Sequence, residues 1–292
     1  MTNKKLLTSS ALTLSFIKYQ SLGNDFILFD WIHSECPPSV DPLGQSAAWK
    51  KMVRSWCNRQ MGIGADGILI LSKDKVTNNI HATIFNQDGS DGDLCLNGAR
   101  CIAHYLAVTE KGTNPGVIIM GKTRIEYVVS ADGTLVEITI PATAFQGPTP
   151  YTVEGTQLAY TVDIGNPHLI IFDQTTVPQL ITTATQLSEQ KRFSNGINIE
   201  FVWQSPATTT DYQMLIYERG VGITQACSSG ACAVLYTLFT LQKIAAGHII
   251  TLHMPGGALQ GAMNTDCMSV MLRATASPLF EGAIPAIFDA TT

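Results

Sequence analysis

The feature that most constrains the fold is a short phrase that occurs twice in the chain. Residues 94–101 read LCLNGARC and residues 226–233 read ACSSGACA. Both follow the pattern Cys-x-x-Gly-Ala, and both lead into an apolar run with the spacing of a helix. Cys95 and Cys227 therefore open two helices in matching local settings.

The order of predicted elements around the two phrases also repeats. Each half begins with two strands joined at a Gly-Asn turn, at residues 23–25 and 165–167, followed by a helix, a strand pair, the helix behind the cysteine and a closing meander. We therefore predict an α+β fold of two similar α/β halves. The Pro-rich segment 141–150 marks the boundary, so that one half spans residues 1–141 and the other spans residues 142–275.

Composition narrows the classes of function. The 292 residues are 45% hydrophobic and carry a net charge of -5 without a long Lys/Arg block, which argues against nucleic acid or an anionic membrane as partner. No apolar run approaches the roughly 20 residues of a membrane helix. The N-terminus is expected to form a short extension into the first strand rather than a signal peptide. Seven cysteines without a C-x-x-C pair fit neither a disulfide framework nor a zinc site, and indicate reduced thiols in the cytoplasm.

A cysteine at the start of a helix is suited to acid–base chemistry. The unpaired N–H groups of the first turn can hold a carboxylate, and the helix dipole favours a thiolate, so that we expect the thiol pKa to fall towards neutrality. If Cys95 and Cys227 face each other across a cleft, one thiolate can remove a proton from one face of a carbon while the opposite thiol protonates the other face. The result is stereoinversion. Either phrase alone is also typical of helix packing, whereas the pair in matching halves favours chemistry.

A wider set of motifs resembles one family. In chain order they are GNDF (23–26), GIGADG (62–67), FNQDGSDGDLCLNGARC (85–101), GNPH (165–168), NIEFV (198–202), ERGVGITQACSSGACA (218–233) and PGG (255–257). Their order resembles that of the diaminopimelate epimerases over nearly the whole chain. The resemblance implies two curved mixed sheets, each wrapped around a central helix, an active site in the cleft between the halves, and a C-terminal segment, residues 276–292, that returns to the first half. It also implies interconversion of LL- and meso-diaminopimelate without pyridoxal phosphate, any other cofactor or a metal.

The resemblance also implies roles for single residues. Cys95 and Cys227 resemble the two acid–base thiols, and His168 and Glu218 resemble polar groups that tune their protonation. The substrate-binding residues implied by the matching motifs are Asn24, Asn86, Leu96, Asn97, Asn166, Asn198, Arg219, Ser228 and Ser229. Within this set Asn24 resembles a contact near the reacting centre. Asn86, Asn166, Asn198 and Arg219 resemble the group that reads the distal centre, where the planar fork of an arginine suits a carboxylate.

The same side chains have local alternatives. Asn24, Asn86 and Asn166 lie in turn sequences and can serve the turns alone. His168 can be a hydrogen-bonded core histidine, and Glu218 with its neighbour Arg219 can be a surface ion pair. We interpret two aspartates, Asp66 and Asp88, as turn formers, and two further cysteines, Cys101 and Cys232, as core residues inside the helices.

The chain departs from the family at two positions. Leu96 and Ser228 stand where the resembled phrases usually have glycine directly after the reactive cysteine. Backbone donors survive this change, but the side chains add bulk beside the sulfur, so we expect a reshaped and more permissive site. Two rival functions stay open: a related racemase of a smaller amino acid such as glutamate or proline, and a catalytically silent binding protein. The expected partner is a small amino acid, and a homodimer is left open.

Overall fold

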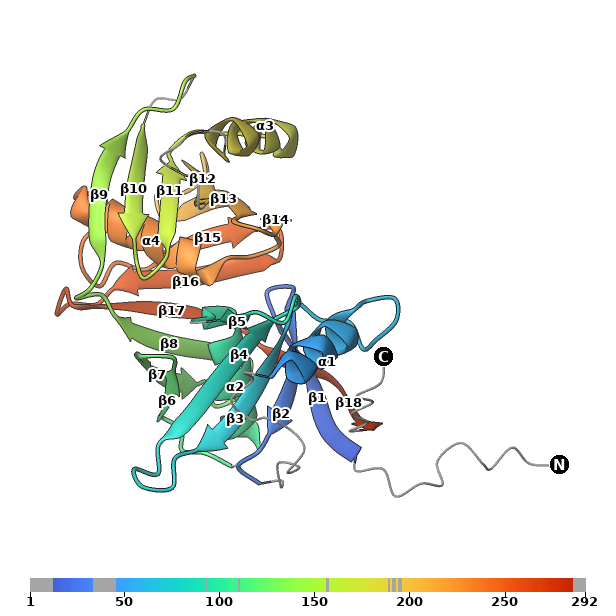
Figure 1. Cartoon of the computed structure of the whole chain (residues 1–292). Helices are drawn as coiled ribbons and strands as arrows, with labels where there is room; N and C mark the ends of the chain where they lie inside the picture. The colour runs from blue at the N-terminus through green and yellow to red at the C-terminus, as the bar shows by residue number, and fades with distance from the viewer. Residues whose placement is uncertain are drawn as a thin grey trace.

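The computed structural model describes residues 13–285 apart from positions 34–45, 93, 110, 156–157, 189, 191–192 and 194–195. The chain forms two α+β halves, one above the other in Figure 1, and each half surrounds a helix that begins just after one of the paired cysteines. The predicted fold class is confirmed. The expected N-terminal extension and Cys36 lie outside the described residues.

The first half is a mixed sheet with one helix on each face. Its strands pair in the order β18-β1-β2-β3-β4-β6-β7-β8, and β2–β3 and β4–β6 are the parallel pairs. Its elements are β1 (Thr13–Ser21), β2 (Asn24–Asp30), α1 (Ala47–Cys57), β3 (Gly67–Lys73), β4 (Ile80–Asn86), β5 (Asp91–Gly92), α2 (Leu96–Val108), β6 (Gly116–Met120), β7 (Thr123–Val129), β8 (Leu135–Pro141) and, from the C-terminus, β18 (Ser277–Pro285).

The second half repeats this plan pair by pair. Its strands are ordered β9-β10-β11-β12-β13-β15-β16-β17, and the parallel pairs β11–β12 and β13–β15 fall at the same places. Its elements are β9 (Gln146–Tyr151), β10 (Ala159–Asp163), β11 (Pro167–Ile171), α3 (Val177–Ser188), β12 (Asn198–Gln204), β13 (Asp211–Glu218), β14 (Gly222–Ile223), α4 (Ser228–Thr240), β15 (Ile250–Met254), β16 (Gly257–Met263) and β17 (Ser269–Thr275).

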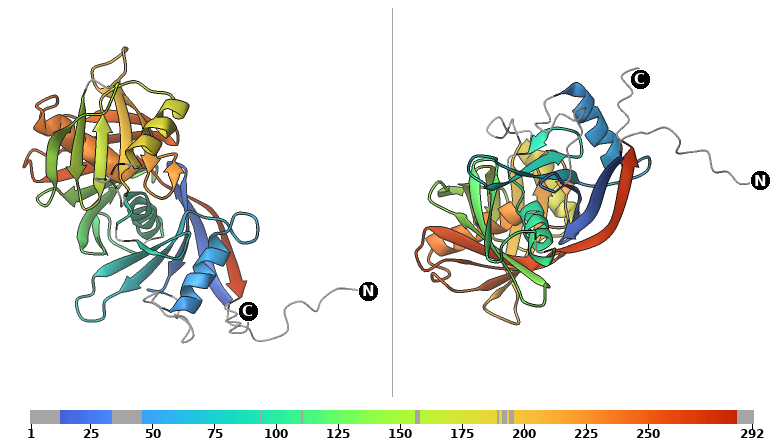
Figure 2. Two further views of the ribbon diagram at one scale, coloured as in Figure 1. Left: turned by 45° about the horizontal axis from the view of Figure 1, so that its top comes forward. Right: turned by 90° about the horizontal axis from the view of Figure 1, so that it is seen from below.

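Two strand pairings join the halves. β8 and β17, the last strands of the two sheets, pair antiparallel from Leu135↔Thr275 to Pro141↔Ser269. β18 then crosses back to pair with β1, and Figure 2 shows this strand, in red, lying along the blue β1. In the strand order of the first half, β18 occupies the place that β9 occupies in the second half.

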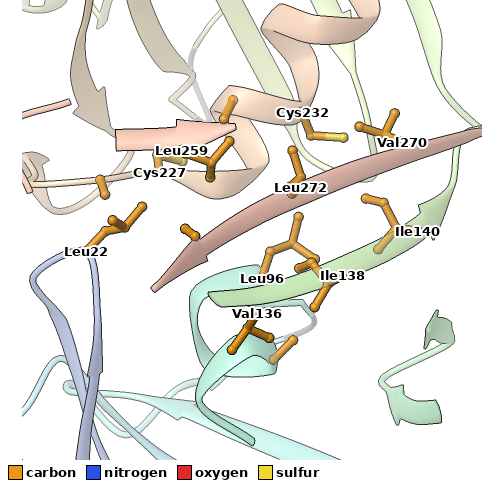
Figure 3. Close-up of a cluster of buried hydrophobic side chains, with 14 of the residues drawn as sticks. Leu22, Leu96, Val136, Ile138, Ile140, Cys227, Cys232, Leu259, Val270 and Leu272 are labelled. Carbon is orange, nitrogen blue, oxygen red and sulfur yellow. The ribbon is translucent and has the colours of Figure 1, made fainter. Parts of the chain in front are cut away.

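The core runs through the joint between the sheets. Every residue of α2 from Leu96 to Leu106 is buried, and so are most residues of α4. Figure 3 shows Ile138 and Ile140 of β8 beside Val270 and Leu272 of β17, with Cys232 of α4 above them. Cys101 and Cys232 are fully buried, as predicted. Among the described helices, none is long and apolar enough to cross a membrane.

Candidate active site

Cys95 and Cys227 cap their helices in the same way. Both have an extended backbone, with φ −133° and ψ 103° at Cys95 and φ −125° and ψ 106° at Cys227. Each sulfur accepts a hydrogen bond at 3.3 Å from the N–H three residues further on, that of Gly98 or of Gly230. Backbone N–H groups in the first turn of a helix have no carbonyl partner within the helix, and that of Asn97 also acts on the Cys95 sulfur. Each helix therefore presents one sulfur together with N–H donors at its start.

Side chains in the first turn of α2 form hydrogen bonds with the backbone and with a side chain at the start of α4. Asn97 donates from Nδ2 to the carbonyl oxygen of Ala226, directly before Cys227, at 3.2 Å. Ser228 donates to Oδ1 of Asn97 at 2.6 Å. Arg100, fully buried, donates to Oγ of Ser228 at 2.8 Å and also to Asn97. The two cysteine-capped helix starts thus converge where the halves meet.

Glu218 acts on both thiols. Burial raises the pKa of this carboxyl, although a 2.6 Å hydrogen bond from the hydroxyl of Thr224 acts to lower it. Its charge in turn contributes to raising the pKa of Cys95 and of Cys227. Glu218 is therefore electrostatically coupled to both thiols.

The thiol pKa values move in the direction opposite to the prediction. Burial raises the pKa of Cys95 to about 11, although the N–H of Gly98 and the charge of Arg100 act to lower it. Burial, then Glu218 and Glu200, raise the pKa of Cys227. The expectation that the helix start brings both thiols towards neutrality is wrong, because loss of water and the nearby carboxylates outweigh the N–H groups.

Asn24 is held beside Cys95 by Asp66. Oδ1 of Asn24 is 3.9 Å from the sulfur of Cys95 and accepts from Nδ2 of Asn97 at 3.2 Å. Its Nδ2 donates to Asp66 at 2.6 Å, and Arg59 donates to the other oxygen of Asp66 at 2.7 Å. The orientation of the Asn24 amide is therefore fixed, and Asp66 does more than form a turn.

His168 is completely buried on the face of the second sheet that α4 covers. Its Nδ1 is 2.7 Å from Oε1 of Glu200, and its Nε2 is 3.1 Å from Oδ1 of Asn166. β11 and β12 run parallel, so that His168 is paired in register with Asn198. Two of the predicted asparagines thus lie next to the predicted histidine.

The backbone of Arg219 is tied to Asn198. Oδ1 of Asn198 accepts from the N–H of Arg219 at 3.0 Å, while its Nδ2 donates to the carbonyl oxygen of Pro167 at 3.1 Å. A cavity of about 430 Å³ opens beside these residues. It is lined by Gln146, Gly147, Thr149, Thr161, Val162, Asp163, Pro167, His168, Phe193, Gly196, Ile197 and Arg219.

Asn86 lies in a different setting from the other predicted residues. It is exposed, and its Nδ2 donates to Oγ of Ser90 at 2.9 Å within the turn that follows β4. A larger hollow of about 780 Å³ elsewhere in the first half contains none of the predicted site residues. Among the residues that the structure describes, no cluster of three or more His, Cys, Asp or Glu side chains is arranged to hold a metal ion.

Comparison with known proteins settles the family. The family model for diaminopimelate epimerase matches residues 16–140 and 160–275. The chain belongs to the diaminopimelate epimerase family. One curated diaminopimelate epimerase, from Microcystis aeruginosa, is 34% identical, and the match covers 93% of this chain and 99% of the relative. Another, from Thermosynechococcus vestitus, is 31% identical over 94% of this chain and 100% of the relative.

Solved structures of other proteins share the fold of this chain. A hydroxyproline epimerase from Agrobacterium vitis superposes with a TM-score of 0.71 at 11% identity, covering 94% of this chain and 93% of the other. A probable proline racemase from Agrobacterium radiobacter gives a TM-score of 0.71 at 10% identity, with 95% and 94% covered. At these identities the likeness concerns the fold alone.

Leu96 and Ser228, where the resemblance led us to expect glycine, are both buried. Leu96 is 2% exposed and lies near Ile138 and Leu272 in Figure 3, and Ser228 is 3% exposed. The Ser228 hydroxyl donates a hydrogen bond to Asn97 and accepts one from Arg100. Both side chains therefore lie in the packed junction of the halves, while Ser229 contacts the Cys227 sulfur at 3.2 Å.

Proposed function

We propose that the protein is a diaminopimelate epimerase that interconverts the LL and meso isomers of diaminopimelate by two-base proton transfer. The observation that carries the proposal is the convergence of two cysteine-capped helix starts, which hydrogen bonds join to each other. Membership of the family supports the same activity. The reaction belongs to the biosynthesis of lysine and of the peptidoglycan precursor.

The proposed site first fixes the substrate carboxylate. The N–H groups proposed to bind it are those of Leu96 and Asn97 at the start of α2, and of Ser228 and Ser229 at the start of α4. Unpaired amides at a helix start, together with the dipole, favour an anion. As charge builds up on the carboxylate when the α-proton leaves, the same donors stabilise the carbanion. The residues after the cysteines thus act through their backbone.

Two protons are then transferred, one from the α carbon to a sulfur and one from the opposite sulfur to the α carbon. One cysteine, as thiolate, takes the α-proton, and the electron pair of the C–H bond stays on the carbanion. The other cysteine, as thiol, gives its proton to the opposite face of the carbon and becomes the thiolate. The configuration is inverted, and the two thiols have exchanged roles for the reverse reaction.

Glu218 and His168 are proposed to set which thiol carries the proton. Burial raises the pKa of Glu218, which brings this carboxyl closer to the thiols in basicity. It can then accept a proton from a neighbouring thiol and release a thiolate. His168 supplies a polar group on the α4 face of the second sheet. Asn24 supports the reacting centre from the side of Cys95.

Recognition of the distal amino-acid centre is assigned to Asn86, Asn166, Asn198 and Arg219. The cavity lined by His168 and Arg219 offers space on that side of the site. A guanidinium binds a carboxylate through two parallel hydrogen bonds, and amides donate and accept. A substrate that lacks the distal centre, such as proline, would make no contact with these groups, which favours diaminopimelate over smaller amino acids.

We also infer a cytoplasmic enzyme and a homodimer. The free thiols of the described residues fit a reducing compartment; they are Cys57, Cys95, Cys101, Cys227, Cys232 and Cys267.

The homodimer is inferred from a sheet edge. Among the described strands β18 pairs only with β1, and Leu279 and Phe280 on it are 52% and 50% exposed. We assign this edge to the dimer interface. Sedimentation of the purified protein tests it, and a monomer at micromolar concentration would rule it out.

Solvent deuterium exchange tests the activity. Reduced protein is incubated with LL-diaminopimelate in D2O, and we expect deuterium at the α carbon together with formation of the meso isomer. Cys95→Ala and Cys227→Ala are each expected to abolish inversion, whereas Cys101→Ala, which removes a core thiol of α2, keeps it. Absence of exchange with folded wild-type protein would remove the epimerase proposal and favour the binding-protein reading. Near-wild-type turnover of either active-site variant would exclude the two-base mechanism.

A further inference from the structure

Glu200 is a carboxylate where the strand pattern calls for an apolar side chain. β12 alternates between the two faces of its sheet: Ile199 and Phe201 pack in the cluster under α3, and Val202 packs in the cluster around α4. Glu200 shares the α4 face, and its side chain is 0% exposed. A buried charge is costly unless it is paired, so that a carboxylate here calls for a specific reason.

One carboxylate oxygen of Glu200 is bound to His168. Oε1 lies 2.7 Å from Nδ1 of the ring, and on the other side of the ring Nε2 faces Oδ1 of Asn166 at 3.1 Å. Both partners are acceptor oxygens in this arrangement. An imidazole that donates from both nitrogens carries two protons and a positive charge. The pair is then a buried ion pair.

The other oxygen of Glu200 has no hydrogen-bond partner among the described residues, although it is buried. The carboxylate lies against the first turn of α4, because a Cβ atom built on Gly230 would collide with Oε1. Glycine at this position lets the carboxylate approach a helix start, whose dipole favours an anion. Gly230 is also the residue whose N–H binds the sulfur of Cys227.

We propose that Glu200 is a positioning residue for epimerisation, which holds the buried ring of His168 doubly protonated. The proposal rests on the proposed function of the site. Glu200 fixes Nδ1–H and balances the charge, so that His168 stays cationic while fully buried. The positive charge of His168 acts to lower the pKa of Glu218, against the negative charge of Glu200, which acts to raise it. Without Glu200 the ring loses both its anchor and the anion that keeps it charged.

The variant that tests this is Glu200→Gln, which preserves shape and an acceptor oxygen but removes the charge. Nitrogen-15 NMR of histidine-labelled protein at pH 7 reports the protons on each ring, and the His168 signals are assigned by their loss in His168→Gln. We expect both ring nitrogens of His168 to be protonated in the wild type, and one proton to be lost in Glu200→Gln. We expect kcat to fall roughly 10- to 100-fold, with KM within about threefold.

Two further variants separate positioning from packing. Glu137→Gln removes a carboxylate that binds Arg273 at the joint of the sheets, and is expected to keep kcat within about twofold. In the His168→Gln background, Glu200→Gln is expected to add less than about twofold, because the two residues act as a unit. A neutral His168 ring in the wild type, or an unchanged kcat in Glu200→Gln, would overturn the proposal.

The spectrum needs neither substrate nor turnover. If wild-type protein fails to epimerise diaminopimelate, the proposed function falls, whatever the spectrum shows. If it does epimerise diaminopimelate and the ring of His168 is neutral, the positioning role of Glu200 falls and the function stands. The two failures are therefore distinguishable in one set of samples.

Discussion

Ser228 donates a 2.6 Å hydrogen bond to Oδ1 of Asn97, and this bond joins the first turn of α4 to the first turn of α2. Ser228 follows Cys227 by one position, and Asn97 follows Cys95 by two. Asn97 continues the connection with its bond to the carbonyl oxygen before Cys227. The relative placement of the two sulfurs is therefore set by contacts among the residues next to them, in addition to the pairing of β8 with β17.

Ser228→Ala should weaken this junction. Asn97 would lose a donor, and buried Arg100, whose Nη1 has no partner among the described residues, would lose an acceptor. Unsatisfied buried polar atoms cost about 1–3 kcal/mol each, so we expect unfolding free energy to fall by that order in urea denaturation. Ser229→Ala is the control, since its half-buried hydroxyl contacts the sulfur of Cys227. Equal stability of the two variants would show that the junction is not held by this bond.

The equivalent glycines of α2 and α4 should respond differently to alanine. A Cβ on Gly98 meets a terminal methyl of Leu69 at 2.8 Å, and that side chain can turn aside. A Cβ on Gly230 collides with the carboxylate of Glu200, which His168 holds in place. We expect Gly230→Ala to destabilise by about 1–3 kcal/mol and Gly98→Ala by less, measured by the same denaturation. The opposite order would mean that Glu200 is free to move.

Alkylation should report the raised thiol pKa values. Because the thiolate is the reactive form, iodoacetamide should modify Cys95 slowly at pH 7 and faster as the pH rises towards about 11. Glu218→Gln removes a negative charge that raises the pKa of both site thiols, so it should accelerate their modification at fixed pH. Peptide mass spectrometry gives the rates, and Cys57, whose pKa burial raises to about 12, serves as internal reference. Unchanged rates in Glu218→Gln would place this carboxylate away from the sulfurs.

Acid should destabilise the protein partly through Asp25. Burial acts to raise the pKa of this carboxyl, but hydrogen bonds from Arg59 and Lys18 outweigh it and lower the pKa to about 2. A folded-state pKa below the unfolded value of about 3.9 gives stability that is present above pH 4 and is lost as the pH falls towards 2. Asp25→Asn should lower stability by up to about 2 kcal/mol at pH 7 and flatten its pH dependence between pH 5 and 2. If the free energy of unfolding depends on pH in the same way in the wild type and in Asp25→Asn, Asp25 is not a source of the acid sensitivity.

Sequence patterns predicted the parts of the site that are local. The helical pattern after Cys95 and Cys227 predicted that each cysteine begins a helix, and both cap a helix in the structure. The apolar spacing predicted Cys101 and Cys232 as core residues, and both are buried. The repeated element order gives the two-sheet fold, which the matching strand orders confirm. These features depend on residues within one turn or one strand of each other, where spacing is informative.

What the sequence did not predict depends on partners that are distant in the chain. Asp66 binds Asn24 from 42 residues away, and Glu200 binds His168 from 32 residues away. A charged residue within the apolar strand NIEFV was the available signal for Glu200, but it does not name the partner. The direction of the thiol pKa values was missed because it depends on burial, which outweighs the helix start.

The place of β18 has a consequence for how the protein is made. A ribosome delivers residues 13–141 first, yet the sheet that they form is one strand short until residues 277–285 have emerged and paired with β1. Until then Leu14 and Phe16, which are buried in the complete fold, lie on an open sheet edge. The first half is therefore the last to be finished, and the order of synthesis is not the order in which the two halves are completed.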